Sequence, residues 1–256
     1  MKHKIIAGIT TKNEDWIIEK TLNSLVNYCD KIIIYDDGST DHTEKICRSF
    51  DSVEWYLRPP HDPLKREEAL QRKELIDILK KWSPDYALLL DADEIPTPSI
   101  VPFLQNMDED INLWQSRMIN LWNSEKHYRI DSYVTPMGVN QSWDPFSKNA
   151  WKKHVLLKMD QKINYEYDLS VQKGGCSRYH PSPGNVPDPV KFQEQFYIIH
   201  YGKLSPTYIN NEKLKYYASI ETADGKGNYS DRFRHHLQCK EGGIPRIVNC
   251  PSEWFW

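Results

Sequence analysis

The chain runs from a strongly apolar stretch, Tyr86-Ala87-Leu88-Leu89-Leu90, directly into the acidic run Asp91-Ala92-Asp93-Glu94. An apolar run of this kind, bounded by polar residues, is typical of a buried strand. Three carboxylates in four residues repel one another unless a cation neutralises them. Hard dications prefer carboxylate oxygens, so the end of this strand is predicted to lie at a divalent metal.

Two further polar segments follow apolar runs. The acidic turn Asp36-Asp37-Gly38-Ser39-Thr40-Asp41 comes directly after Ile32-Ile33-Ile34-Tyr35, and Thr10-Thr11-Lys12-Asn13-Glu14 follows the first apolar stretch of the chain. In an open α/β sheet, ligands bind outside the carboxyl ends of the strands. Because all three loops would meet at that edge, we expect a nucleotide-and-metal site there.

Up to residue 90, apolar runs alternate with segments of helical periodicity. Strands are predicted over residues 4–9, 31–35, 53–57 and 86–90, and helices over residues 15–27, 41–50 and 64–82. This βαβαβαβ order is typical of a mostly parallel sheet with helices on both faces.

Beyond Glu94 the pattern changes. Thr97-Pro98 is typical of a helix start. Longer strands are predicted over residues 111–122 and 151–159, antiparallel and mixed into the sheet, followed by a short strand over 196–201 and a helix from Ser205-Pro206 to about residue 220. We therefore expect an α/β fold in one domain, residues 1–256, with a ligand-binding half over 1–105 and a mixed antiparallel second half over 106–256.

Composition excludes several classes of protein. The formal net charge of −3 argues against a nucleic-acid partner. Five widely spaced cysteines without CxxC spacing indicate neither a zinc site nor a disulfide framework. There is no apolar run of transmembrane length, and the start of the chain has the pattern of a strand instead of a secretion signal. We expect a soluble, cytoplasmic protein.

Together, the three motifs resemble glycosyltransferase family 2, which has the GT-A fold. The resemblance covers residues 4–105 and continues weakly through His200-Tyr201-Gly202 and the lysine-rich helix after it. It implies that the Asp-x-Asp turn holds Mn²⁺ or Mg²⁺ against the diphosphate of a nucleotide-sugar. Asp93 would be the direct ligand, and Asp91 would contact the ribose or reach the metal through water. His200 would be a further metal ligand, unless it only forms a hydrogen bond in the core.

The resemblance also assigns nucleotide contacts. The acidic turn after the second strand would recognise the base, typically uracil, with Asp37 accepting from a base N–H and Asp36 supporting the loop. The same turn would cap the following helix. Nucleotide-binding residues are also expected in the loop after the first strand: Thr10, Thr11 and Asn13. There Lys12 replaces a tyrosine that is frequent in the family, which weakens the case for base stacking.

An arginine near the start of the third helix reaches the diphosphate in the family. Arg66 matches that position best and Arg72 is the second choice. A solvated basic helix face, with neighbouring glutamates as partners, is the alternative for this segment.

The catalytic base is the least defined part of the site. Inverting transfer needs a carboxylate that deprotonates the acceptor hydroxyl. The second half lacks the His-Glu or Glu-Asp pair usual in the family. Asp168 is the first choice and Asp144 the second, with Glu166 and Asp188 as further candidates.

The sequence thus predicts a glycosyltransferase of the hexosyl- or pentosyltransferase class. It would move a sugar from a nucleotide-sugar, most simply a UDP-sugar, to a hydroxyl of a glycan, lipid-linked or protein acceptor, as in glycan biosynthesis. Two other classes stay open: a metal-dependent nucleotidyltransferase, and a catalytically inactive module that binds a nucleotide-sugar or glycan.

Overall fold

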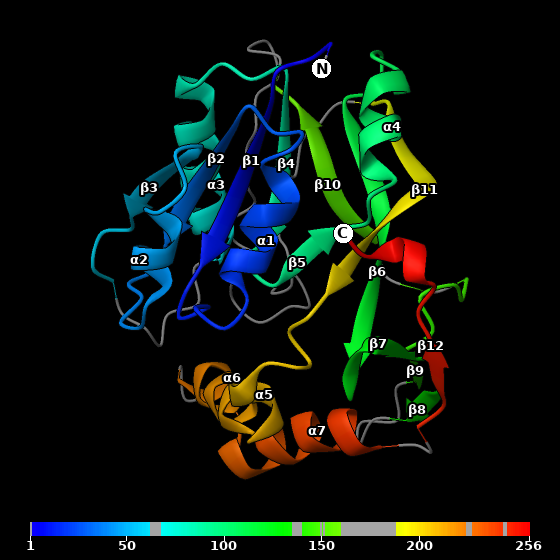
Figure 1. Ribbon diagram of the computed structural model, residues 1–256. Helices are drawn as coiled ribbons and strands as arrows, with labels where there is room; N and C mark the ends of the chain where they lie inside the picture. Colours follow the sequence, from blue (N-terminus) through cyan, green and yellow to red (C-terminus); the bar gives the residue numbers. More distant parts are fainter. Residues whose placement is uncertain are drawn as a thin grey trace.

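A ten-stranded mixed sheet forms the centre of the described part of the chain (Figure 1). The computed structural model describes residues 2–61, 68–134, 140–148, 150, 152–159, 188–223, 227–242 and 245–256. The first half of the sheet holds the parallel strands β3 (Val53–Leu57), β2 (Lys31–Asp36), β1 (Ile5–Thr11) and β4 (Tyr86–Asp91), in that order. All four strands predicted for this half are confirmed.

Helices cover both faces of this parallel half. One face carries α1 (Ile18–Leu25), α2 (Thr43–Cys47) and α4 (Ile100–Asn106), and the other carries α3 (Glu68–Lys81). Two apolar clusters fill the gaps between helices and sheet, because alternate strand residues point to opposite faces. Ile5, Ile9 and Ile32 pack on the α1 side, whereas Ile6 and Ile33 pack against α3.

The second half of the sheet is mixed. Its strands are β10 (Lys152–Lys158), β6 (Leu113–Trp122), β7 (Ser124–Arg129) and β12 (Ile247–Asn249), each antiparallel to its neighbour from β4 outward. The strand β11 (Val190–His200) runs parallel to β6 and antiparallel to β5 (Glu94–Pro96). The predicted α/β fold class, with a parallel first half and a mixed second half, is confirmed.

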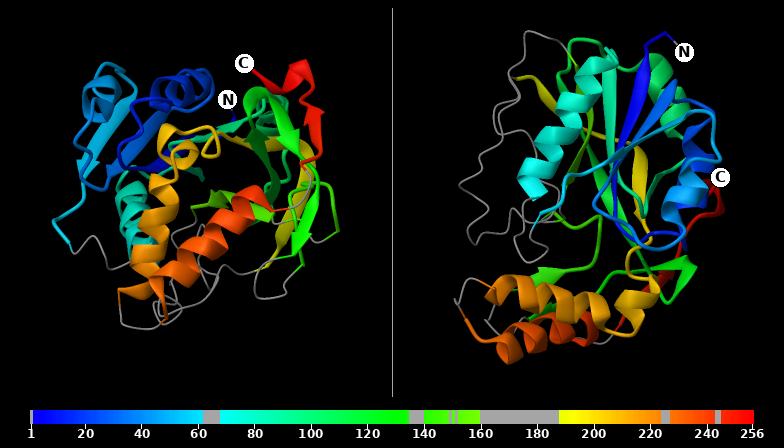
Figure 2. Two further views of the ribbon diagram at one scale, coloured as in Figure 1. Left: turned by 90° about the horizontal axis from the view of Figure 1, so that it is seen from below. Right: turned by 90° about the vertical axis from the view of Figure 1, so that its left-hand side faces the viewer.

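The chain after β11 forms a helical layer below the carboxyl ends of the parallel strands (Figures 1 and 2). It consists of α5 (Pro206–Ile209), α6 (Glu212–Thr222) and α7 (Tyr229–Glu241). A separate two-stranded sheet joins β8 (Ser132–Val134) and β9 (Asn140–Ser142), and a 3₁₀ turn covers Ser252–Trp254. Within the described ranges, no helix is both long and apolar enough to cross a bilayer.

Two predictions for the second half need correction. The strand predicted over residues 196–201 is the end of the longer strand β11, which starts at Val190. The single helix predicted from Ser205 to about residue 220 is two helices, because Asn211 adopts a left-handed conformation with φ of 68° between them. Asparagine tolerates this conformation better than most residues, but a continuous helix cannot pass through it.

Candidate active site

The loop after β2 is held in place by its own first carboxylate. Asp36 is 1% exposed, and its Oδ2 accepts hydrogen bonds from the N–H groups of Gly38 (3.0 Å) and Ser39 (2.8 Å). Gly38 has a φ of 81°, which glycine adopts most readily. Asn13 joins this loop to β1, because its Oδ1 accepts from the Thr40 N–H at 2.7 Å. Asp36 and Asn13 therefore both hold this loop in place.

Asp37, the next residue, is anchored by basic side chains. Its Oδ1 accepts from Arg58 Nη1 at 3.1 Å and lies 3.2 Å from His61 Nε2, while Lys12 Nζ is 3.4 Å from Oδ2. The Asp37 side chain keeps 17% of its surface exposed. The Arg58 side chain is only 5% exposed, so it fixes the carboxylate from the protein side. Asp37 is thus a partly open acceptor at the edge of the sheet.

Asp91, the first acid after β4, is bound by two side chains of the same half. Its Oδ1 accepts from the Thr10 hydroxyl at 2.9 Å and from Arg72, whose Nη1 also donates to the Leu90 carbonyl at 3.2 Å. Arg72 is 6% exposed. The second-choice arginine for the diphosphate is therefore turned to Asp91, and Arg66 lies outside the described residues. Thr11 is 4% exposed and uses its carbonyl to accept from the Asp37 N–H.

Asp93 and His200 meet although 107 residues separate them in the sequence. Asp93 Oδ2 lies 3.4 Å from His200 Nε2. On the other side of the ring, Nδ1 is 2.7 Å from Asn120 Oδ1, so Nδ1–H donates to this oxygen and Nε2 is directed at the carboxylate. The register explains the contact, because His200 pairs with Asn120 on β6 and with Glu94 on β5.

Gly202 leaves room for this pair. A Cβ atom at position 202 would lie 2.5 Å from both Asp93 Oδ2 and His200 Nε2, which is closer than real Cβ contacts. The Tyr201 N–H donates to the Asp93 carbonyl at 2.8 Å and holds the two segments together. A larger residue at position 202 would therefore displace the Asp93 or His200 side chain.

Positive charge keeps Asp93 ionised inside the protein. Burial alone would raise the pKa of the Asp93 carboxyl, but the charges of His200 and Lys213 hold this pKa well below its usual range. Lys213 comes from the first turn of α6, and its Nζ lies 3.7 Å from Asp93 Oδ2. Asp93 therefore presents a full negative charge at neutral pH.

Glu14 has the opposite behaviour. Burial and the negative charge of Asp93 raise the pKa of the Glu14 carboxyl to about 8. Its Oε2 accepts from Trp16 Nε1 at 2.7 Å. Glu14, Asp91 and Asp93 thus form one electrostatically coupled acidic group at the ends of β1 and β4.

Glu94 belongs to the same acidic run but has a structural role. It is fully buried and accepts from the Lys153 ammonium of β10, which is 1% exposed. Its Oε2 also accepts from the Asp91 N–H at 2.6 Å. This ion pair ties the Asp-x-Asp turn to the antiparallel half of the sheet.

A divalent metal fits the Asp93–His200 pair by its donor chemistry. A carboxylate and a neutral imidazole nitrogen are both ligands for Mn²⁺, and the second nitrogen of the ring is fixed by an outer partner, as is usual for metal-binding histidines. Across the described residues, no cluster of three or more His, Cys, Asp or Glu side chains has metal-binding geometry. Asp91 is directed at Thr10 and Arg72 and does not join Asp93 and His200 in such a cluster.

The base candidates are only partly placed. Asp168 and Glu166 lie outside the described residues. Asp144 Oδ1 accepts from the Phe146 N–H at 2.9 Å and closes a turn. Asp188 precedes β11, whereas His200 ends this strand of 11 residues. At about 3.3 Å per residue, roughly 30 Å separates them, which removes Asp188 as a candidate base.

Sequence reasoning missed the residues that support the predicted ones. The principal examples are Arg58, Asn120, Lys153, Gly202 and Lys213. Only His200-Tyr201-Gly202 had a local signal, because it follows an apolar strand. Asn120 and Lys153 act through strand pairings that span many residues, so their position in the sequence gives no indication of their role.

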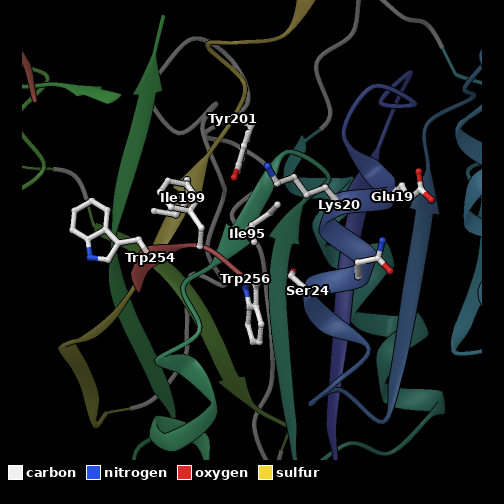
Figure 3. Close-up of a pocket in the computed structure, with 10 residues that line it drawn as sticks. Glu19, Lys20, Ser24, Ile95, Ile199, Tyr201, Trp254 and Trp256 are labelled. Carbon is white, nitrogen blue, oxygen red and sulfur yellow. The ribbon is translucent and has the colours of Figure 1, made fainter. Parts of the chain in front are cut away.

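A hollow of about 460 Å³ lies apart from the predicted site residues (Figure 3). It is lined by Ile95 of β5, Ile199 of β11 and Tyr201, which directly follows β11, together with Lys20 of α1 and Trp254. Neighbouring residues of a strand face opposite sides, so Ile95 and Ile199 face away from Glu94 and His200. None of the predicted site residues lines this hollow.

Comparisons with known proteins agree with the motifs. Residues 7–162 match the family described as Glycosyl transferase family 2. No curated protein matches the chain. Among solved structures, glucosyl-3-phosphoglycerate synthase from Mycobacterium tuberculosis in complex with Mn²⁺, UDP and glucosyl-3-phosphoglycerate is 25% identical, with 46% of this chain and 44% of that chain covered and a TM-score of 0.34. The same synthase with Mn²⁺, UDP and phosphoglyceric acid is 27% identical, with 46% and 43% covered and a TM-score of 0.33.

These matches cover less than half the length of the solved chains. The family match is broader. It spans more than half of this chain, from within β1 to just beyond β10. On this ground, the chain belongs to glycosyl transferase family 2.

Proposed function

We propose that this protein transfers a sugar from a UDP-sugar to an acceptor hydroxyl, with Mn²⁺ or Mg²⁺ as cofactor. The observation that carries the proposal is the Asp93–His200 contact of 3.4 Å. It lies at the sheet edge where the strands β1 and β2 also end. In this family 2 chain, the ionised and buried Asp93 carboxylate supplies a negative charge at this edge. That charge would hold the dication of a metal-diphosphate complex.

Asp37 would bind the uracil base. The Arg58 guanidinium holds one carboxylate oxygen, so the carboxylate does not need to reorganise when it accepts from a base N–H. The Asp36 loop supports this orientation through backbone hydrogen bonds. Thr10, which donates to Asp91, would lie beside the ribose.

Asp93 and His200 would hold the dication. When bound, the metal neutralises the charge that develops on the diphosphate as the sugar leaves. Asn120 holds the His200 ring so that Nε2 lies on the Asp93 side, and Gly202 keeps this space open. Asp91 would contribute a fixed negative charge and would contact the ribose.

The acceptor would enter from the second half of the chain. We infer transfer with inversion, in which a carboxylate takes the proton of the acceptor hydroxyl. Asp168 remains the first choice for this base and Asp144 the second. The hydrogen bond from the Phe146 N–H to Asp144 would have to open or be shared for Asp144 to act.

A direct test measures UDP release from several UDP-sugars with Mn²⁺, with and without a panel of glycan, lipid-linked and peptide acceptors. Asp93→Ala should reduce release at least about a hundredfold, because charge stabilisation of the leaving group is lost. Asp51→Ala, at an exposed acid in the turn before β3, is the matched control and should keep wild-type release. Tight UDP binding by the wild type without turnover of any UDP-sugar would contradict the enzyme and favour a binding module.

A further inference from the structure

The hollow between α1, β5 and residues 254–256 has the size and lining of a ligand pocket. Its volume of about 460 Å³ lies within the usual range of small-ligand pockets, about 300–1,000 Å³. Figure 3 shows Glu19, Lys20 and Ser24 of α1 on one side of it, Trp254 on the opposite side, and Trp256 between them. One wall is therefore polar and the other aromatic.

Trp256 provides a fixed aromatic surface in this hollow. Its ring stacks on Tyr28, with centroids 5.5 Å apart and 14° between the ring planes, and its Nε1 donates to the Pro96 carbonyl at 2.7 Å. Trp256 nevertheless keeps 49% of its surface exposed and lines the hollow, which Tyr28 does not. Because the ring is already held at two points, a ligand that stacks on its open part does not have to order it.

The α1 wall offers hydrogen-bonding groups. Glu19 and Asn23 are exposed, lie one helical turn apart and both line the hollow. Among the described residues, no side chain forms a hydrogen bond or an ion pair with either of these two side chains. Lys20, in contrast, forms an ion pair with Glu125 and lies 4.8 Å from the ring centre of Tyr201. The open polar groups are therefore a carboxylate that accepts and an amide that donates and accepts.

We propose that this hollow binds a neutral glycan. A sugar ring has apolar C–H faces and a rim of hydroxyl groups, so it can stack on the Trp256 indole while its hydroxyls bond to Glu19 and Asn23. An anionic ligand would meet the charge of Glu19, whereas Lys20 is already neutralised by its ion pair. A lipid chain would bury the Glu19 carboxylate without a partner.

This glycan site would be separate from the site of transfer. Ile95 and Ile199 line the hollow, and their neighbours Glu94 and His200 face the other side of the strands. A glycan in the hollow therefore does not displace a ligand of the Asp93–His200 pair. The inference goes beyond the proposed function, because binding here needs neither a nucleotide nor a metal.

NMR spectroscopy of the indole N–H groups can locate the bound sugar. The protein has nine tryptophans, and single Trp→Phe variants assign their signals. The probes are cellotetraose, maltotetraose, mannotetraose and chitotetraose, each added without UDP or metal. At least one of them should shift the signals of Trp254 and Trp256 and leave that of Trp55 on β3 unchanged.

Two pairs of variants then measure the contribution of each wall. Trp256→Ala should lose about tenfold or more in affinity for that tetrasaccharide, as expected for an aromatic anchor. Its control is Tyr229→Ala on α7, where a ring stacked on Phe233 is 42% exposed. Asn23→Ala should lose about twofold to tenfold, the range for one hydrogen bond, whereas Asn27→Ala, just after α1, should match the wild type.

Three results would overturn the proposal. The first is that no tetrasaccharide shifts the signals of Trp254 and Trp256. The second is that Trp256→Ala and Asn23→Ala bind the sugar as well as their controls. The third is that a nucleotide or a lysophospholipid shifts these signals and the sugars do not. A protein that binds a tetrasaccharide at Trp256 but no UDP with either metal would refute the proposed function and support the glycan site.

Discussion

At the scale of single residues, two neighbouring carboxyl groups respond oppositely to the same burial. Asp93 faces His200 and Lys213, and their charges outweigh the effect of burial and lower its pKa. Glu14 lies partly buried near Asp93, and burial and that negative charge raise the pKa of its carboxyl to about 8. One acid is therefore suited to hold a cation, whereas its neighbour retains a proton up to mildly alkaline pH.

This difference predicts a pH dependence of stability that Glu14 controls. The pKa of Glu14 is about 8 in the folded protein and near 4.5 in the unfolded chain, so the folded state binds the proton more tightly. The stabilising contribution is fully present below pH of about 4.5 and is lost as the pH rises through about 8. Relative to Glu14→Gln, the wild type should lose about 3–4 kcal/mol of unfolding free energy between pH 5 and pH 8, measured by urea unfolding with EDTA.

Asp15→Asn, at the next position in the chain, is the control for the effect of removing an acid from this loop. Asp15→Asn should show the same pH dependence of the unfolding free energy as the wild type. If Glu14→Gln and the wild type show parallel stability curves from pH 5 to pH 8, Glu14 does not retain its proton in the folded state.

At the scale of elements, a buried ion pair joins β5 to β10. Glu94 and Lys153 are 0% and 1% exposed, and each loses its solvation when the strands pair. Removing one partner of such a pair leaves a buried charge and costs about 3–5 kcal/mol, whereas replacing both by apolar residues is often neutral. Lys153→Met should therefore destabilise the fold by about 3 kcal/mol in urea unfolding, and Glu94→Leu/Lys153→Met should recover most of it.

A control for this prediction is Lys152→Met, one residue earlier on β10 at an exposed position. It should change the unfolding free energy by less than about 0.5 kcal/mol. Equal effects of Lys152→Met and Lys153→Met would show that the Glu94 contact contributes little to stability.

Elements of the first half could be predicted because their signals are local. The strands β1, β2 and β4 each contain a short apolar run, and each acidic loop follows such a run directly. The break between α5 and α6 could not be predicted, because the apolar periodicity continues while Asn211 takes a left-handed conformation. Lys240 Nζ donates to Asn211 Oδ1 at 2.6 Å and to the Tyr208 carbonyl at 2.9 Å, so a distant helix stabilises this break.

At the scale of the whole molecule, the site joins two differently organised halves. The parallel half contributes the loops with Thr10, Asp37 and Asp93. The mixed half contributes His200 through β11, which pairs with β6. A strand pairing between residues so far apart depends on the packing of the complete sheet, so sequence patterns predict the acids well and their partners poorly.

The helical layer of α5, α6 and α7 completes the carboxyl edge of the sheet (Figure 1). It brings Lys213 within 3.7 Å of Asp93, although the sequence around Lys213 resembles an ordinary charged helix. At this edge, the acids of the parallel half therefore face a lysine of the helical layer.

The binding of UDP with and without Mn²⁺, measured by calorimetry, tests the metal-diphosphate site most directly. In the wild type, Mn²⁺ should increase UDP affinity by at least about tenfold. Asp93→Asn should remove nearly all of this increase, His200→Ala should remove part of it, and the control Asp51→Asn should retain it. Equal UDP affinity of the wild type with and without Mn²⁺ would contradict a metal-diphosphate site at Asp93 and His200.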